Sequence, residues 1–275
     1  MDTLKRINSL LENDITNRPN YPHALITFLK KERILKPRMV IADIGSGTGQ
    51  SAELFLKEGN LVYGIEPNKE MREAGERLLK AYPNFKSIEA TAEYTTLENE
   101  CVDLIIAGQA FHWYDQEKCK QEFKRILKRN ASLSDRQACL PDRQACLPDR
   151  QVVLISNNRR TESTPFLQAY EDFTKMFATD YLPVNHKNMD GILNDFFESG
   201  YKIKSFLYEQ HFDLGGLKSL VQSSSYMPAE GHKDFDFMMS VLKKIFTRFQ
   251  NQHNLLDKKG EVKLEYDTNI YYGKL

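Results

Sequence analysis

The strongest indication of the fold is the segment Asp43-Ile44-Gly45-Ser46-Gly47-Thr48-Gly49. It joins a short apolar run to a segment with helical spacing. The apolar run, residues 39–44, is stopped by glycines and is typical of a buried parallel strand. Residues 50–57 have helical spacing and end at Gly59-Asn60. Glycines let the backbone turn tightly and approach a ligand closely, so the pattern predicts a strand, a binding loop and a helix.

Further strand and helix patterns alternate along the chain. We predict strands at residues 61–66, 85–90, 102–107, 152–156, 201–214 and 261–272, and helices at 67–79, 117–129, 162–179, 191–198 and 233–250. This alternation predicts an α/β fold with a doubly wound, mostly parallel sheet. The last two strands fit an antiparallel, hairpin-like pair at the end of that sheet. We expect one domain over residues 1–275, with segments 160–200 and 215–258 forming an inserted helical lid.

Composition and charge exclude several classes of function. The chain has 275 residues, 41% of them hydrophobic, which is typical of a globular protein. Lys+Arg and Asp+Glu both number 38, and a net charge of zero argues against duplex DNA or long RNA as a partner. No apolar run approaches about 18 residues, and the start lacks a signal-peptide core, so we expect a cytoplasmic protein outside the membrane. The cysteines form no CxxC pair, which argues against a zinc knuckle or disulfide framework; they stand at 101, 119, 139 and 146.

A seven-residue unit is repeated between the predicted helix at 117–129 and the strand at 152–156. Ser134-Asp-Arg-Gln-Ala-Cys-Leu is followed by Pro141-Asp-Arg-Gln-Ala-Cys-Leu and then by Pro148-Asp-Arg-Gln. Two units are too few for a coiled coil, and proline recurs in each. We interpret residues 134–151 as a duplicated loop insertion on the side of the sheet away from any site, because ligands bind at the carboxyl ends of the strands.

An acidic residue completes the signal for a nucleoside ligand. Glu66 ends the second predicted strand, where a carboxylate accepts hydrogen bonds from the two hydroxyls of an adenosine ribose. Dinucleotide folds use GxGxxG, whereas this loop reads GxGxG with Asp43 two residues before its first glycine. A carboxylate at that position would repel a diphosphate, whereas it would attract a ligand that carries an ammonium and a sulfonium group.

At this point the chain resembles the class I S-adenosylmethionine-dependent methyltransferases. Its glycine loop is similar to their motif I, and further segments match the parts after their second, third and fourth strands. The group it resembles is methyltransferase type 11, which includes trans-aconitate methyltransferase-like proteins, and the likeness runs from about Arg18 to Asn158 without the repeat. The other matching segments are Arg18-Pro19-Asn20-Tyr21-Pro22, Glu66-Pro67-Asn68 with Met71, Thr91-Ala92-Glu93, and residues 107–115.

The resemblance implies a seven-stranded, Rossmann-like methyltransferase fold that binds S-adenosylmethionine. It places Asp43 and the glycine loop at the methionine end, Glu66 at the ribose, and Gln109 in the passage beneath the sulfonium. The implied cofactor-binding residues are Arg18, Asp43, Gly45, Ser46, Gly47, Gly49, Glu66, Pro67, Asn68, Met71, Ala92, Glu93, Gln109 and Ala110. The chain departs from the family at Ser46, where many relatives carry Cys, and in lacking a Pro-Gly-Gly turn before the fifth strand.

Phe111-His112-Trp113-Tyr114-Asp115 holds the candidates for catalysis. His112 is a candidate general base for a hydroxyl or carboxyl substrate; alternatively, it is only a wall of the pocket, because positioning alone accelerates an in-line methyl transfer. Tyr21 is a second catalytic candidate and, with Trp113, a candidate for contacting substrate. Structural alternatives stand beside these roles: Asp43 as a cap of the following turn, and Glu93 as an ordinary surface acid. The remaining histidines lack partners at ligand spacing, so no metal site is expected.

The sequence therefore predicts an enzyme that transfers a methyl group from S-adenosylmethionine to a small molecule, such as a carboxylate or a hydroxyl compound. The sequence has neither an Asn/Asp-Pro-Pro-Tyr/Phe segment nor a Pro-Cys pair. Their absence argues against methylation of nucleic-acid bases. One alternative is a protein that binds S-adenosylmethionine without transfer, as a sensor or scaffold. Another is an NAD-dependent oxidoreductase, which the GxGxG loop with Asp43 disfavours. The sequence gives no indication of oligomeric state.

Overall fold

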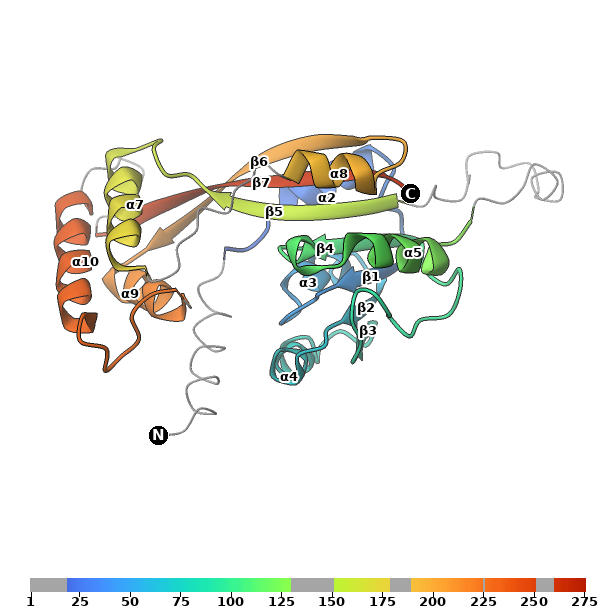
Figure 1. Ribbon diagram of the computed structural model, residues 1–275, viewed down its shortest axis with the longest axis horizontal. Coiled ribbons are helices and arrows are strands. Elements are labelled where there is room, and N and C mark those ends of the chain that lie inside the picture. Colours follow the sequence, from blue (N-terminus) through green and yellow to red (C-terminus); the bar gives the residue numbers. More distant parts are fainter. Residues whose placement is uncertain (1–18, 130–150, 179–188, 225, 251–259) are drawn as a thin grey trace. The chain divides into compact units, whose positions relative to one another are not determined.

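The computed structural model describes residues 19–129, 151–178, 189–224, 226–250 and 260–275 (Figure 1). Its strands are β1 (Val40–Ile44), β2 (Leu61–Ile65), β3 (Phe85–Ile88), β4 (Leu104–Gly108), β5 (Gln151–Arg159), β6 (Tyr201–Phe212) and β7 (Val262–Lys274). Its helices are α2 (His23–Lys31), α3 (Gln50–Leu56), α4 (Lys69–Leu78), α5 (Gln116–Ile126), α7 (Pro165–Phe177), α8 (Met189–Phe196), α9 (Leu214–Ser223) and α10 (Phe235–Phe249), with a 3₁₀ turn η1 (Phe111–Trp113). The heptapeptide repeat lies almost entirely outside the described residues, so its placement stays a prediction.

The strands form one seven-stranded sheet in the order β3-β2-β1-β4-β5-β7-β6. The pairs β3–β2, β2–β1, β1–β4 and β4–β5 are parallel, and Asp43 on β1 stands level with Gly64 on β2 and Ile106 on β4. The chain passes from β1 outward to β3 and then returns to the other side of β1 with β4. This reversal creates a crevice at the carboxyl ends of β1 and β4, which is where open α/β sheets bind ligands. The predicted doubly wound, mostly parallel sheet is confirmed.

The chain divides into two compact units, each described here by itself. The core unit comprises Tyr21–Ser156, His186–Phe206 and Thr268–Leu275. The helical unit comprises Met1–Asn20, Asn157–Asn185 and Leu207–Asp267. Of the helices that lie in the segments predicted to form a lid, α7, α9 and α10 belong to the helical unit and α8 belongs to the core unit. Their role as a lid stays a prediction.

The core unit buries both faces of its parallel strands. Successive side chains of a strand point to opposite faces, so Ile105 and Ala107 of β4 join one apolar cluster, while Leu104 and Ile106 join the other. The first cluster is completed by α5 and α8, and the second by α2 and α3. Because β4 is covered on both faces, it reads as a continuous apolar run in the sequence.

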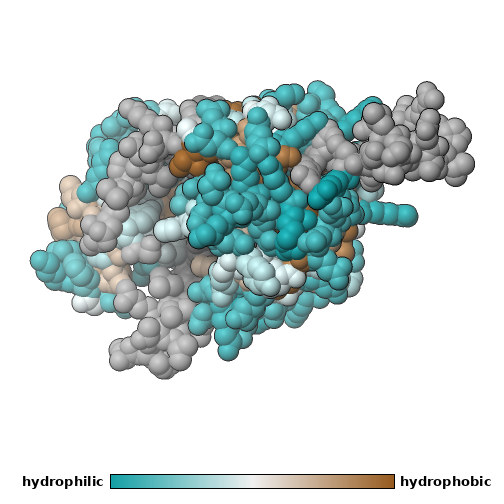
Figure 2. All heavy atoms as spheres, turned by 45° about the vertical axis from the view of Figure 1, so that its right-hand side comes forward, coloured by the Kyte–Doolittle hydropathy of each residue, from teal (hydrophilic) through white to brown (hydrophobic). Residues whose placement is uncertain are grey.

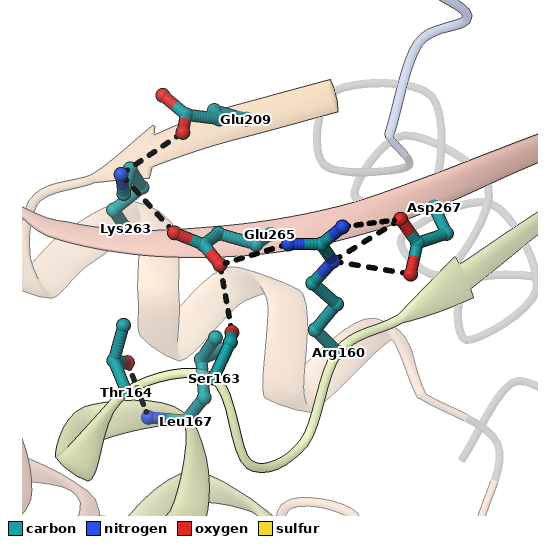
Figure 3. A network of polar contacts seen from close by, with 8 residues as sticks. All are labelled: Arg160, Ser163, Thr164, Leu167, Glu209, Lys263, Glu265 and Asp267. Atoms are coloured by element: carbon teal, nitrogen blue, oxygen red, sulfur yellow. Dashed lines mark hydrogen bonds and ion pairs between the residues drawn. The ribbon is translucent and has the colours of Figure 1, made fainter. Parts of the chain in front are cut away.

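The helical unit has an apolar cluster of its own, built from α7, α9, α10 and the adjoining parts of β6 and β7. Figure 3 shows the charged network that ties the start of α7 to these strands. Arg160 donates to Asp267 at 2.7 Å, and Ser163 donates to Glu265 at 2.7 Å. Lys263 lies between the carboxylates of Glu265 (3.1 Å) and Glu209 (2.9 Å). The aromatic residues Phe166, Tyr170, Phe173 and Phe177 of α7 are buried and belong to the core of this unit.

Several element boundaries differ from the sequence prediction. The predicted helix at 117–129 ends at Ile126, because Leu127 is extended and forms a parallel bridge with Val102. The fifth strand runs on to Arg159, and the last strand of the chain, β7, lies between β5 and β6. The sequence patterns did not predict the helices α2 and α9 or the turn η1. On the face drawn in Figure 2, the spheres of hydrophobic residues appear only in small groups. Within the described residues, no helix is both long and apolar enough to cross a membrane.

Candidate functional site

The glycine loop lies at the carboxyl end of β1, in the crevice of the core unit. Its first turn is held by the Ile65 carbonyl, which accepts hydrogen bonds from the N–H groups of Gly45 (2.9 Å) and Ser46 (3.1 Å). Gly45 has a φ of +64°, and a Cβ on it would stand 2.6 Å from the Tyr114 hydroxyl oxygen. Gly47 has a φ of +54° and no atom within 4 Å of the place where its Cβ would stand. The loop is therefore packed tightly at Gly45 and open at Gly47, as a cradle for a ligand requires.

Glu66 joins the end of β2 to this loop. Its Oε2 accepts a hydrogen bond from the Gly47 N–H at 2.9 Å, and its Oε1 accepts one from the Asn68 N–H at 2.9 Å. The side chain is only 7% exposed, so the carboxylate is fixed in place. Each carboxylate oxygen has two lone pairs and retains capacity to accept a further hydrogen bond, as binding of a ribose diol requires.

Asp43 is fully buried at the bottom of the crevice. Its Oδ2 accepts a hydrogen bond from the Ser51 hydroxyl at 2.7 Å, whereas its Oδ1 has no hydrogen-bond partner within the described part of the chain. Burial, assisted by the nearby charge of Glu66, raises the pKa of Asp43 to about 7, although bonds from Ser51 and the Ala52 backbone act in the opposite direction. A buried, unsatisfied acceptor is costly, so this oxygen fits a donor or a cation on a ligand.

Two segments, residues 67–71 and 92–93, lie where the family resemblance implies contacts with the adenine of the cofactor. Both are ordered by their own hydrogen bonds. Asn68 caps α4, because its Oδ1 accepts a hydrogen bond from the Met71 N–H at 2.9 Å, while Pro67 is exposed. Ala92 is buried, and Glu93 Oε1 accepts a hydrogen bond from the Asp115 N–H at 3.1 Å. Although burial acts to raise it, the pKa of Glu93 is lowered, chiefly by this bond. The contacts of these residues with an adenine, and the alternative of Glu93 as an ordinary surface acid, stay predictions.

The turn at residues 109–115 packs against the glycine loop. The Tyr114 hydroxyl donates a hydrogen bond to the Ile44 carbonyl at 2.8 Å, immediately before the first glycine. The Ala110 Cβ lies 2.7 Å from the place where a Cβ on Gly45 would stand. Gln109 has a φ of +57° and donates its N–H to the Ile155 carbonyl at 2.9 Å. The turn is therefore fastened both to β1 and to β5.

On its other side the turn borders a small hollow of about 30 Å³ in the core unit. We call this the β4–β5 hollow; it is lined by residues 109–112, 154–156, Leu193 and Tyr271. Partial desolvation lowers the pKa of His112, which favours its neutral form at physiological pH. The Trp113 side chain is 81% exposed and is not among the lining residues, but its ring centroid lies 4.9 Å from that of His112.

Tyr21 lies on the same side of the sheet as Ser51. A Cβ on Gly108 would stand 2.6 Å from the Tyr21 hydroxyl oxygen and 3.3 Å from the Ser51 hydroxyl oxygen. The Tyr21 side chain is 8% exposed, so it is part of the wall at the end of β4. Its catalytic and substrate roles stay predictions.

The structure thus brings together most of the predicted site residues. Asp43, the glycine loop and Glu66 meet at the carboxyl ends of β1 and β2, with Ala110 against the loop. Ala110 and His112 lie on the turn that separates this cradle from the β4–β5 hollow. Arg18 lies outside the described residues. Within those residues, no group of three or more His, Cys, Asp or Glu side chains could hold a metal ion.

Two residues of the site were missed by the sequence analysis as functional candidates. Ser51, which binds Asp43, stands in the first turn of α3, where a serine next to the loop is the only local signal. Tyr114, which binds the Ile44 carbonyl, was quoted only as part of the segment after the fourth strand. The Tyr114 bond joins residues 70 positions apart, so spacing along the chain could not reveal it, whereas Ser51 follows Asp43 by only 8 positions.

Comparison with known proteins agrees with this geometry. Residues 42–134 match the model of a methyltransferase domain. The chain is 30% identical over 120 residues to an uncharacterized methyltransferase of Schizosaccharomyces pombe, covering 43% of this chain and 47% of that protein. It is 32% identical over 126 residues to a probable S-adenosylmethionine-dependent methyltransferase of Saccharomyces cerevisiae, covering 42% and 41%. The matches thus span less than half the length of these curated relatives.

A solved structure has the same fold. A putative type II methyltransferase from Anaeromyxobacter dehalogenans superposes with a TM-score of 0.62 at 16% identity, covering 94% of this chain and 97% of that one. At this identity the likeness shows the fold alone. Residues 42–134 are therefore similar to a methyltransferase domain, and the sheet has the fold of that solved structure.

Proposed function

We propose that the protein is an S-adenosylmethionine-dependent methyltransferase that acts on a small-molecule acceptor. The observation that carries the proposal is the pair of carboxylates at the glycine loop, with a buried, unpartnered oxygen on Asp43 and a fixed carboxylate on Glu66. The methyltransferase domain match over residues 42–134 covers this pair. The identity of the cofactor is supported by the name of one relative, a probable S-adenosylmethionine-dependent methyltransferase.

The residues present fit this cofactor. Asp43 Oδ1 lies where an ammonium group would be neutralised, and such a pairing would remove the cost of a buried, unsatisfied carboxylate oxygen. Glu66 would accept hydrogen bonds from the ribose hydroxyls while still holding the Gly47 N–H. When bound, the cofactor supplies an electrophilic methyl group on a sulfonium.

The acceptor is proposed to bind beside the turn at residues 109–112, at the carboxyl ends of β4 and β5. An in-line displacement needs the acceptor atom held opposite the departing sulfur, and rigid walls supply that positioning. Gln109 and Ala110 stand between the cradle and the hollow, and His112 lines the hollow with a lowered pKa. A carboxylate acceptor needs no deprotonation, whereas a hydroxyl acceptor would pass its proton to His112.

The resemblance to trans-aconitate methyltransferase-like proteins supports a carboxylate as the acceptor, and the neutral imidazole of His112 supports a hydroxyl. Replacing His112 by glutamine distinguishes a carboxylate acceptor from a hydroxyl acceptor. For a hydroxyl acceptor, turnover falls by about a hundredfold or more while cofactor affinity is kept. For a carboxylate acceptor, turnover of the His112→Gln variant stays close to that of the parent.

The proposal is tested by incubating the protein with radiolabelled S-adenosylmethionine and panels of small carboxylic acids and phenols, and measuring S-adenosylhomocysteine. Formation that depends on an acceptor and is lost in Asp43→Asn supports it. Cofactor binding without transfer to any acceptor would instead indicate a sensor or scaffold. Binding of NAD in place of S-adenosylmethionine would indicate an oxidoreductase.

A further inference from the structure

The core unit has a larger hollow at the amino ends of β1 and β2. Its volume is about 430 Å³, which falls within the usual range for ligand pockets. We call it the amino-end hollow, because its walls come from the end of α2, the segment before β1 and the turn before β2. Asp43 and Glu66 lie at the carboxyl ends of the same two strands. The amino-end hollow is therefore separate from the proposed cofactor cradle.

Charged side chains dominate the lining of this hollow. Lys30, at the end of α2, forms an ion pair with Glu58, whose side chain is only 19% exposed. Arg33 and Lys36 add two further positive charges. With three cations and one carboxylate, the lining carries a net charge of +2 at neutral pH. A concave surface with such an excess of positive charge attracts anions.

Arg33 stands where local structure favours glycine. It follows the end of α2 with a φ of +59°, a left-handed conformation that is strained for residues with a Cβ. The turn is closed by hydrogen bonds from the Arg33 N–H to the Lys30 carbonyl (3.0 Å) and from the Ile34 N–H to the Leu29 carbonyl (2.9 Å). Within the described residues, the Arg33 guanidinium has no hydrogen bond or ion pair of its own. The fold therefore gives no reason for arginine here, whereas binding of an anion does.

Asn60 adds a buried polar group to the wall of the hollow. Its Nδ2 donates hydrogen bonds to the Lys36 carbonyl at 3.0 Å and to the Met39 carbonyl at 3.4 Å, which ties the turn before β2 to the segment before β1. Asn60 is fully buried, and its Oδ1 has no hydrogen-bond partner in the part of the chain that the structure describes. A buried acceptor without a donor is costly, so this oxygen suits a hydroxyl group on a ligand.

We propose that the amino-end hollow binds a phosphate ester of a small polar molecule, such as a sugar phosphate, and that Arg33 is its main phosphate-binding residue. A phosphate monoester carries a charge of about −1.5 to −2 at pH 7, which matches the charge of the lining. The planar guanidinium can bind two phosphate oxygens at once. Leu35 and Pro37 offer an apolar wall and Asn60 an acceptor, as the apolar face and the hydroxyls of a sugar require.

Matched probes test the class of ligand on the parent protein. Ribose 5-phosphate, ribose, inorganic phosphate and succinate are each titrated by calorimetry at low ionic strength, because salt screens exposed charges. Ribose lacks the charge, inorganic phosphate lacks the sugar, and succinate is a dianion without phosphate. We expect ribose 5-phosphate to bind about tenfold or more tightly than each of the other three.

A variant pair tests the role of Arg33. Arg38→Gly is the matched control for Arg33→Gly, because Arg38 is also exposed, also has a positive φ (+62°) and does not line the hollow. Each variant removes one cation and places glycine where the backbone favours it, so both should fold. We expect Arg33→Gly to weaken binding of ribose 5-phosphate about tenfold or more, and Arg38→Gly about threefold or less. Thermal denaturation checks that both variants are folded.

The outcomes separate the ligand class, the residue and the proposed function. Binding of ribose 5-phosphate that is no tighter than that of ribose or succinate overturns the phosphate site, and equal binding of inorganic phosphate overturns the sugar. Equal weakening by Arg33→Gly and Arg38→Gly overturns the role of Arg33. The titrations contain no S-adenosylmethionine, so they decide this proposal whether or not the proposed function holds. Both variants should bind S-adenosylmethionine as the parent does.

Discussion

The carboxylate of Glu66 accepts a hydrogen bond from the Gly47 N–H at 2.9 Å, so one acidic side chain joins the end of β2 to the glycine loop. The same carboxylate also accepts the Asn68 N–H at 2.9 Å. Glu66 therefore shapes the site before any ligand is present. In the proposed complex it would also hold the ribose, which gives one residue a structural and a binding role.

Replacing Glu66 by alanine should weaken binding of S-adenosylmethionine by about 1–3 kcal/mol, because charge-assisted hydrogen bonds are lost. Calorimetric titration measures the change. Glu73→Ala is the control, since Glu73 is exposed on α4 and its ion pair with Lys69 is long, at 3.9 Å. An unchanged affinity in folded Glu66→Ala would remove Glu66 from the site.

Binding of S-adenosylmethionine should depend on pH through Asp43. Its pKa of about 7 means that the carboxyl group is largely protonated below neutral pH, whereas a cationic ligand favours the carboxylate. Affinity is therefore expected to fall as pH drops from 8 to 6, and binding near pH 6.5 should release protons. Calorimetry in buffers of different ionisation enthalpy measures that release. A parent protein that releases no more protons than Asp43→Asn would contradict this assignment.

Asp43 should also affect folding stability. Its pKa in the folded state is raised from 3.8, so the folded chain binds this proton more tightly than the unfolded chain. The resulting stabilisation is complete below about pH 4 and is lost as pH rises to about 7. The parent should therefore lose about 2 kcal/mol of unfolding free energy between pH 5 and pH 8 that Asp43→Asn, which has no titrating group at this position, does not lose. Urea denaturation at both pH values tests this; a constant difference would contradict it.

Tyr114→Phe should cost about 1–3 kcal/mol of unfolding free energy, because it leaves the Ile44 carbonyl without the hydroxyl that donates to it. It should also weaken cofactor binding, since Ile44 immediately precedes the glycine loop. Tyr94→Phe serves as control. Because Tyr94 is 69% exposed, its replacement should change the unfolding free energy by no more than about 0.5 kcal/mol. Equal stability of the two variants would show that the Tyr114 bond is unimportant.

Trp113 should report the protonation of His112. The two rings lie 4.9 Å apart, and a protonated imidazole quenches indole emission. Because desolvation lowers the pKa of His112, we expect the emission to change at a pH below the usual range for histidine. The transition should vanish in His112→Gln. A transition that persists in that variant would assign the signal to another group.

Local patterns in the sequence predicted the strands and helices around the crevice, because each has its own periodicity and its own stop signal. The run that becomes β1 ends at Gly45, and the helix that becomes α3 begins directly after Gly49. Asp43 and Glu66 could be identified as partners of one site, because parallel strands bring their carboxyl ends to one edge of a sheet.

Contacts between distant segments could not be predicted in this way. The bond from Tyr114 to Ile44 joins residues 70 positions apart, and Leu193 reaches the β4–β5 hollow from a helix near residue 190. Similarly, β7 lies between β5 and β6, an order that alternation along each strand does not encode. The end of α5 at Ile126 depends on the bridge between Leu127 and Val102, which is also a tertiary contact.

The most direct test is calorimetric titration of the purified protein with S-adenosylmethionine, S-adenosylhomocysteine and NAD. We predict micromolar binding of the first two, no binding of NAD, and weaker binding of the first two to Glu66→Ala. Binding of NAD alone would contradict the assignment of the cofactor, and binding of none of the three would leave the carboxylate pair at the glycine loop without its proposed ligand.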